Sequence, residues 1–95
     1  MVNLEFDPAK EKSNREKHGV DFSTVEVAFA DPWSMTLPNE THSSKNEKRF
    51  YLIGFDGVGI LTVRFTLRNQ SIRVIGAGYW RKHRKLYEEN KATNL

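Results

Sequence analysis

Alternation of hydrophobic and polar residues marks four stretches of the chain as β-strands. They cover residues 33–37, 48–55, 60–68 and 72–77. Asp56-Gly57 is a strong hairpin signal, and Asn69-Gln70 leaves room for only a two-residue turn. The last three stretches should therefore form an antiparallel meander, with residues 33–37 extending one edge.

A helix is predicted over residues 8–18. Asp7 supplies an N-cap acceptor, Pro8 suits the first helical position, and Gly19 suits the position after the end. One side of this helix is polar and carries Lys10, Asn14, Lys17 and His18. These residues either make structural hydrogen bonds and lay lysine stems over the sheet, or they form part of an edge that contacts RNA.

A second helix should begin at Ser23 and end before Pro32. Ser23 and Glu26 fit a capping box, across which Phe22 can pack against Val27. Its apolar stripe consists of Phe22, Val25, Ala28 and Phe29. We expect this stripe to pack on one face of the sheet.

These elements predict a single domain over residues 1–95 with an α+β fold. Two N-terminal helices pack on a small antiparallel β-meander, and a C-terminal helix follows the hinge at Gly76-Ala77-Gly78. A short strand over residues 3–6 is also predicted.

The two faces of the predicted meander differ in chemistry. On the middle strand, Leu61, Val63, Phe65 and Leu67 point to the helices, and Thr62, Arg64, Thr66 and Arg68 point away. The two-residue turn places Thr66 opposite Arg73. The outward face therefore gathers Arg49, Tyr51, Arg64, Arg68 and Arg73. Like charges facing one another across strands are destabilising unless a ligand neutralises them, which favours an anionic ligand.

The segment after the last strand mixes cations with aromatic rings. Arg81, Lys82, Arg84 and Lys85 surround His83 between Tyr79-Trp80 and Tyr87. Cations at the start of a helix oppose its dipole, so an outside anion would stabilise them. Such a segment suits a nucleic acid, because charges meet phosphates while rings stack on bases.

Composition adds a charge asymmetry. The net charge is +3, but residues 1–31 hold four Lys/Arg against seven Asp/Glu, and residues 32–95 hold eleven against five. Only the second part is a candidate for binding a polyanion. The absence of cysteine, of a membrane-length apolar run and of a signal peptide at the N-terminus leads us to expect a cytoplasmic protein.

Several motifs resemble those of the BrnT family of toxin ribonucleases. The opening pattern has Asp7-Pro8, Lys10 and Asn14, followed by Lys17-His18-Gly19-Val20 and Phe22. Similar motifs occur at residues 29–32, 47–50, 66–68 and 72–75. The resemblance implies an α+β fold similar to RelE toxins and RNA cleavage that blocks translation. It also implies a cognate antitoxin as the partner, whose complex with the toxin binds operator DNA.

The resemblance marks Lys10, Asn14, Lys17, His18, Arg49, Thr66, Arg68 and Arg73 as functional positions. The chain departs from the family after the last strand, where Gly76 and Gly78 stand at the usual Ser and Arg. The run to Tyr87 is one residue shorter, and the usual Glu is absent, although Glu88 lies just beyond. Either catalysis is rearranged onto Arg81, His83 and Tyr87, or the chain belongs to a subgroup with weakened cleavage that mainly binds partners.

Internal cleavage of RNA needs only proton transfer and stabilisation of phosphate charge, which His and Arg can supply. His83 is the preferred acid–base candidate, and its cationic neighbours should lower its pKa. The predicted catalytic residues are Arg68, Arg73, Arg81, His83 and Tyr87. The predicted RNA-binding residues are Lys10, Lys17, His18, Arg49, Arg64, Trp80, Lys82 and Arg84. No metal or other cofactor is expected, because the sequence has no Asp/Glu/His cluster at metal-ligand spacing.

The predicted antitoxin should neutralise the protein by covering the same basic surface, at Arg68, Arg73, Trp80 and Arg81. The alternatives are a toxin that has lost catalysis and acts as a corepressor, or an RNA-binding module.

Overall fold

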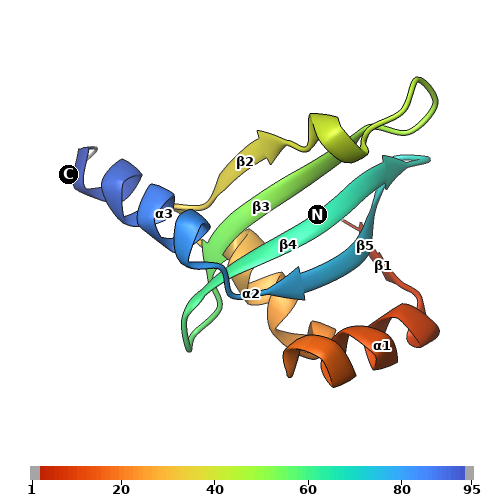
Figure 1. Cartoon of the computed structure of the whole chain (residues 1–95), viewed down its shortest axis with the longest axis horizontal. Coiled ribbons are helices and arrows are strands. Elements are labelled where there is room, and N and C mark those ends of the chain that lie inside the picture. Colours follow the sequence, from red (N-terminus) through yellow and green to blue (C-terminus); the bar gives the residue numbers. More distant parts are fainter. Residues whose placement is uncertain (1–2, 94–95) are drawn as a thin grey trace.

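Five strands form one mixed sheet in the computed structural model, which describes residues 3–93 (Figure 1). The strands are β1 (Asn3–Phe6), β2 (Met35–Pro38), β3 (Arg49–Phe55), β4 (Ile60–Arg68) and β5 (Ser71–Gly78). Their order across the sheet is β1-β5-β4-β3-β2. The helices of the described part are α1 (Pro8–His18), α2 (Val25–Ala30) and α3 (Arg81–Thr93), with short 3-10 turns η1 (Phe22–Thr24) and η2 (Glu40–His42). The fold class is α+β, as predicted.

The meander of β3, β4 and β5 is confirmed, with β2 antiparallel to β3 at one edge. Thr66 lies opposite Arg73, as the turn length required. Asn69 and Gln70 both have positive φ, 51° and 67°. A two-residue turn with positive φ at both positions matches the twist of the flanking strands, which explains the register.

The predicted antiparallel meander is one part of a mixed sheet, because the strand predicted over residues 3–6 also joins it. A strand, β1, precedes the helices, and it pairs with β5 in parallel, with Leu4 opposite Ile72. Parallel neighbours need a long connection, and here all the intervening helices and strands provide it. The alternation of apolar and polar residues predicted the strand over residues 3–6, but it could not show that this strand pairs with β5.

The chain enters α1 as predicted, but its entry into α2 differs. The Asp7 side chain accepts a hydrogen bond from the Ala9 amide (2.9 Å). Before α2, Asp21 rather than Ser23 acts as the cap, because its carboxylate accepts the Ser23 amide at the start of η1. Val27 is 48% exposed, so the predicted capping box and its apolar contact are replaced by the 3-10 turn.

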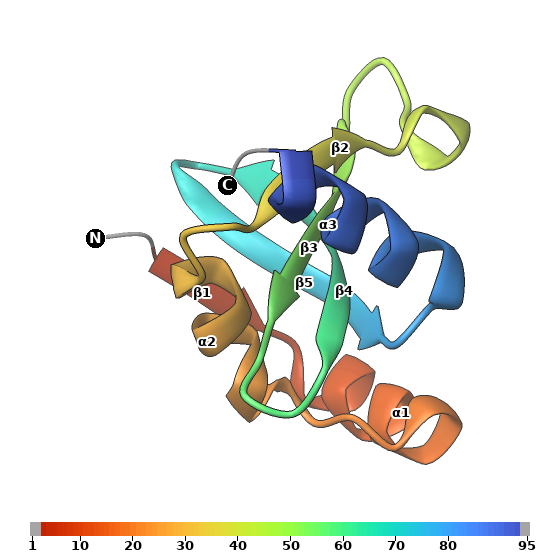
Figure 2. The same ribbon diagram turned by 90° about the vertical axis from the view of Figure 1, so that its left-hand side faces the viewer.

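The core lies between α2 and one face of the sheet. Phe22, Val25 and Ala28 are buried in a cluster with Leu61, Val63 and Phe65, and Phe29 packs against it. Leu67, expected in the same cluster, is 59% exposed, because it lies beside the turn at the end of β4. Figure 2 shows α2 and α3 on opposite sides of the sheet, so the outward face is partly covered by α3.

Polar hydrogen bonds, rather than an apolar stripe, attach α1 to the sheet. The buried Asn14 side chain donates to the carbonyls of Val20 (2.9 Å) and Ala77 (2.8 Å) and accepts from the Ala77 amide (2.9 Å). The structural interpretation of Asn14 is therefore confirmed. His18, on the same helix, is exposed.

A tyrosine fastens α3 to the other side of the molecule. The buried Tyr87 donates its hydroxyl hydrogen bond to Asp31 (2.6 Å), which also accepts the amides of Trp33 and Phe55. Burial acts to raise the pKa of Asp31, but these three hydrogen bonds outweigh it and lower the pKa. None of the described helices is both long and apolar enough to span a bilayer.

Candidate nucleic-acid interface

The outward face of the sheet carries the predicted arginines. Arg64 is the register partner of Tyr51 on β3 and of Gly76 on β5, while Arg73 lies opposite Thr66 one row away. Arg64 points away from the core formed by Leu61, Val63 and Phe65, which confirms the predicted division of faces. This face is open where α3 does not cover it, so its cations are available to a ligand.

One end of the face is less positive than the sequence suggested. Glu47, just before β3, pairs with Arg49 (2.8 Å) and lies 3.8 Å from Arg68. The hydrogen bond from Arg49, followed by the nearby charges, lowers the pKa of Glu47 despite the opposing effect of desolvation. A single carboxylate thus offsets two of the four arginines, and the uncompensated charge shifts toward Arg64 and Arg73.

Arg64 lies directly over the backbone of β5. A Cβ added at Gly76 would overlap its Nη2 atom and would lie 3.0 Å from its Cζ. The guanidinium therefore occupies the space that a side chain at residue 76 would fill. Because residue 76 is a glycine, the Arg64 guanidinium can lie against the backbone of β5.

Gly78 brings two distant segments together. A Cβ at this residue would meet the His18 ring at 3.7 Å and the Trp80 indole nitrogen at 3.7 Å. His18 ends α1 and Trp80 immediately precedes α3, so the end of β5 is the point where the two helices converge. Gly76 and Gly78 thus both lie beneath cationic or aromatic side chains from other parts of the chain.

Three rings pack together beside Arg64. Ring centroids are 4.9 Å apart for Tyr51 and His83, 5.2 Å for Trp80 and His83, and 5.7 Å for Tyr51 and Trp80. Tilted and edge-on geometries of this kind are the preferred ones for aromatic pairs. We call Tyr51, Arg64, Trp80 and His83 the ring–arginine cluster.

His83 is buried at the base of this cluster. Its Nδ1 lies 3.0 Å from the hydroxyl of Thr62, and only 8% of the residue is exposed. Burial, followed by the charge of Lys82, lowers the pKa of His83. The predicted direction is confirmed, but burial is the larger cause. At neutral pH the ring is uncharged and supports the neighbouring aromatic side chains.

A hollow of about 160 Å³ lies between α1 and β4–β5. It is lined by Lys10, Ser13, Asn14, Lys17, His18, Arg64 and Ile75, and we call it the α1 hollow. Four of the seven residues are basic, and Lys10, Lys17 and His18 are exposed. Arg64 lies opposite Tyr51 in the sheet and also lines the α1 hollow, so it stands between this hollow and the three rings.

The remaining predicted residues lie elsewhere. Tyr87 is buried against Asp31, and Arg68 lies at the Glu47 end of the sheet. Arg81 and Arg84 line a larger hollow on the far side of Trp80, and Lys82 is exposed on α3. The fold therefore unites Lys10, Lys17, His18, Arg64, Trp80 and His83, but it separates them from Arg81, Arg84 and Tyr87.

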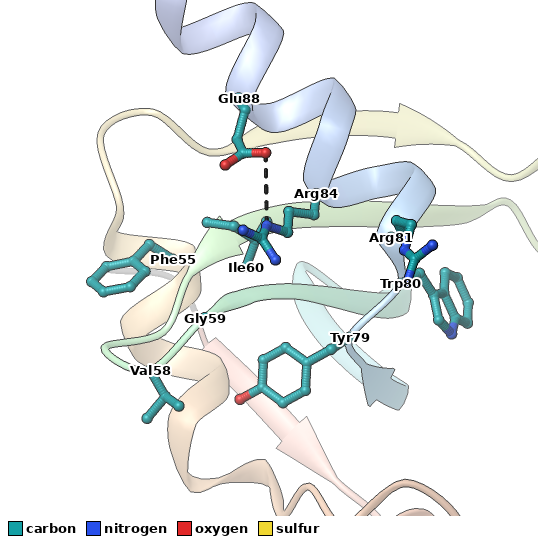
Figure 3. Close-up of a pocket in the computed structure, with 9 residues that line it drawn as sticks. All are labelled: Phe55, Val58, Gly59, Ile60, Tyr79, Trp80, Arg81, Arg84 and Glu88. Atoms are coloured by element: carbon teal, nitrogen blue, oxygen red, sulfur yellow. Dashed lines mark ion pairs between the residues drawn. The ribbon is translucent and has the colours of Figure 1, made fainter.

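The larger hollow, of about 690 Å³, is shown in Figure 3. We call it the α3 groove, and it is lined by Phe55, Val58, Gly59, Ile60, Tyr79, Trp80, Arg81, Arg84 and Glu88. Trp80 is its only member that also belongs to the ring–arginine cluster.

Tyr51, Thr62 and the two glycines were not among the predicted site residues. For Tyr51 the sequence offers a usable signal, because the alternation of side chains along the strand puts it on the same face as the arginines. The position of His18 and Trp80 beside Gly78 left no such signal, because His18 ends α1 and Trp80 precedes α3. Within residues 3–93, no three His, Cys, Asp or Glu side chains gather closely enough to form a candidate metal site.

These features define a small α+β protein with a basic, aromatic sheet face. A family model described as "Ribonuclease toxin, BrnT, of type II toxin-antitoxin system" matches residues 6–83. The chain therefore belongs to the BrnT family of ribonuclease toxins, as the sequence motifs predicted, and membership implies an antitoxin partner. Among curated proteins, no sequence matches the chain.

Proposed function

We propose that this BrnT-family protein cleaves RNA internally, on the surface formed by the ring–arginine cluster and the α1 hollow, and thereby blocks translation. The observation that carries the proposal is Arg64, whose guanidinium lies on Gly76 between the ring cluster and the lysines of α1. Arginine holds phosphate oxygens well, and adjacent rings stack on bases. One side chain thus joins a phosphate subsite to a base subsite.

The proposed reaction is attack by the ribose 2′-oxygen on the adjacent phosphorus. A new P–O2′ bond forms, the P–O5′ bond breaks, and the products carry a 2′,3′-cyclic phosphate and a 5′-hydroxyl. A base removes the 2′-OH proton, an acid protonates the leaving 5′-oxygen, and cations stabilise the phosphorane. Side chains alone can supply all three functions, so we propose that cleavage is independent of metal ions and other cofactors.

We assign proton transfer to His18 rather than to His83. Imidazole can accept and donate a proton near neutral pH, provided that it reaches the substrate. His18 is exposed and lines the α1 hollow with Arg64, whereas His83 is buried and its Nδ1 is engaged by Thr62. His83 then has a positioning role, because it supports Tyr51 and Trp80 from beneath.

The other basic residues serve as a track for the RNA backbone. Lys10 and Lys17 would flank the reacting phosphate, and Arg73 extends the positive surface along the sheet. Arg49 and Arg68, both paired with Glu47, would contribute less. Arg81 and Tyr87 are omitted from the catalytic group, because Arg81 lines the other groove and the Tyr87 hydroxyl binds Asp31.

The biological setting follows the family. We propose that the mRNA substrate is cleaved as by RelE-like toxins. In this proposal a cognate, DNA-binding antitoxin neutralises the protein, and the toxin–antitoxin complex binds operator DNA. This part of the proposal is supported by the family match over residues 6–83.

The test is cleavage of single-stranded RNA by the purified protein in the presence of a metal chelator. His18→Gln should lower the cleavage rate by about 10²–10⁴-fold while leaving RNA affinity nearly unchanged. Lys17→Gln should weaken binding, and Lys12→Gln, on the same helix but outside the α1 hollow, is its matched control. Full activity of His18→Gln, or loss of activity with the chelator, would contradict the mechanism.

A second candidate function is RNA or partner binding without cleavage. It is favoured by one observation, the glycine at residue 78 where the family usually has arginine. This candidate predicts RNA binding that depends on Arg64 but no product with a cyclic phosphate end, even for the wild-type protein.

A further inference from the structure

The α3 groove presents apolar side chains to solvent. Val58 is 83% exposed, Tyr79 is 47% exposed and Phe55 is 46% exposed, although all three line one groove. Contiguous exposed apolar side chains in a small protein usually mark an interaction site. Figure 3 shows the Val58 and Tyr79 side chains on one side of the turn between β3 and β4 and the Phe55 ring on its other side, with α3 above them.

The opposite rim of the groove is cationic. Arg81 and Arg84 come from the first turns of α3, and the first turn of this helix contains no acidic residue. Arg84 lies 3.7 Å from Glu88, whereas no ion pair to Arg81 is found among residues 3–93. Cations at a helix N-terminus are unfavourable, so a carboxylate supplied by a ligand would offset both the Arg81 charge and the helix dipole. The chemistry of the rim therefore favours an acidic group in a ligand.

Two acidic residues make RNA a poor occupant. Glu88 lines the groove, and Asp56 accepts the Tyr79 hydroxyl hydrogen bond (2.5 Å) and the amides of Val58 and Gly59. These hydrogen bonds outweigh the effect of burial and lower the pKa of Asp56, so its carboxylate is charged at neutral pH. A phosphate chain carries a negative charge at every nucleotide and would bring several of them near these carboxylates. An apolar segment with one acidic group can instead place its single charge at Arg81.

We propose that the α3 groove is the docking site for an apolar, acidic segment of the antitoxin. The proposal rests on the proposed function only in naming the antitoxin, which family membership implies. Its apolar side chains would cover Val58, Phe55 and the Tyr79 ring, and its carboxylate would pair with Arg81. This surface differs from the arginine face of the sheet that was predicted as the antitoxin site.

Trp80 links this groove to the RNA surface. Its indole lines the α3 groove and contacts the rings of Tyr51 and His83 on the other side. A segment docked in the groove would hold the Trp80 ring in one position and place negative charge beside the RNA surface. The antitoxin could then neutralise the protein without covering Arg64 or Arg73 directly.

The experiment uses the full chain and, as the probe, the purified product of the reading frame adjacent to its gene. Val58→Asp should lower the affinity for that protein by about tenfold or more, and Arg81→Glu should do the same. Both variants should retain wild-type RNA cleavage. Leu67→Asp is the matched control. Leu67 is also an exposed apolar residue (59% exposed), but it lies at the far end of β4 and outside the groove, so this substitution should change neither property.

Each alternative has a distinct result. Unchanged affinity in Val58→Asp and Arg81→Glu, or an equal loss in Leu67→Asp, overturns the proposal, as does a probe that fails to bind the wild-type chain. Loss of RNA binding in Val58→Asp would make the groove an RNA surface. Conversion of a wild-type dimer to a monomer without an effect on the probe would make it a self-association site. If the wild-type chain cleaves no RNA but the affinities follow the expected pattern, the proposed function fails and the docking site stands.

Discussion

At the scale of single residues, one glycine on β5 decides what the site can contain. Gly76 leaves room for the Arg64 guanidinium, whereas a side chain at Gly78 would make only ordinary contacts with His18 and Trp80. A cation from the neighbouring strand takes the space over residue 76, so a side chain placed there would displace it.

Replacing Gly76 by Ser should displace Arg64 and lower RNA cleavage by about tenfold, a loss of about 1.4 kcal/mol of transition-state stabilisation. The melting temperature should change little, because the contact involves the far end of a flexible side chain. The measurement is kcat/KM for RNA cleavage together with thermal unfolding.

A double-mutant cycle supplies the control. In an Arg64→Ala background, Gly76→Ser should have almost no further effect on cleavage, because the side chain that it displaces is already gone. Additive losses would show that residue 76 acts independently of Arg64.

At the scale of elements, α3 is fastened to α2 through the hydrogen bond from Tyr87 to Asp31. Burial, then the hydrogen bond to Asp31 and the Asp31 charge, raise the pKa of Tyr87 to about 12. The folded state therefore prefers the protonated phenol. Its stabilising contribution is complete below the ordinary tyrosine pKa of about 10 and is lost as the pH rises toward about 12.

Tyr87→Phe should lower the free energy of unfolding by about 1–2 kcal/mol at neutral pH, because Asp31 loses a hydrogen-bond partner. It should also flatten the decline in stability between pH 10 and 12. Urea denaturation over this pH range measures both effects. An unchanged alkaline slope in the variant would place the titrating group elsewhere.

Caps, turns and side-chain alternation in the sequence predicted most of the helices and strands. The features that they missed depend on contacts between distant parts of the chain. Asp7-Pro8 and Gly19 fixed the limits of α1, and the turn at Asn69-Gln70 fixed the register of β4 and β5. The parallel pairing of β1 could not be predicted in this way, because its partner lies about 70 residues away, as in Leu4 and Ile72. The same holds for the site, where alternation placed Arg64 correctly but only the fold brings His18 and Trp80 to Gly78.

At the scale of the whole molecule, the positive charge is concentrated on one side of the sheet and around its junction with α1. Glu47 reduces this charge at one end, so the remaining phosphate contacts should come mainly from Lys10, Lys17, Arg64 and Arg73. Binding through such contacts releases counterions and depends on salt.

A plot of log affinity for single-stranded RNA against log salt concentration should have a slope of about −3, since each of about four contacts contributes about −0.7. Arg73→Ala should reduce the steepness by about one contact, and Arg68→Ala should reduce it less, because Glu47 already lies beside Arg68. A salt-independent affinity would show that this surface does not bind RNA.

The side-chain amide of Asn14 has a consequence for solubility as well as for packing. β1 pairs with β5 only as far as Val74, so the later part of β5 would otherwise expose its backbone N–H and C=O groups to another chain. Asn14 hydrogen-bonds both groups of Ala77 and thus occupies the position of a missing neighbouring strand. Unpaired strand edges are common sites of intermolecular β-pairing. One amide on a helix therefore protects the molecule against edge-to-edge aggregation, and a chain that lacks it should self-associate through β5.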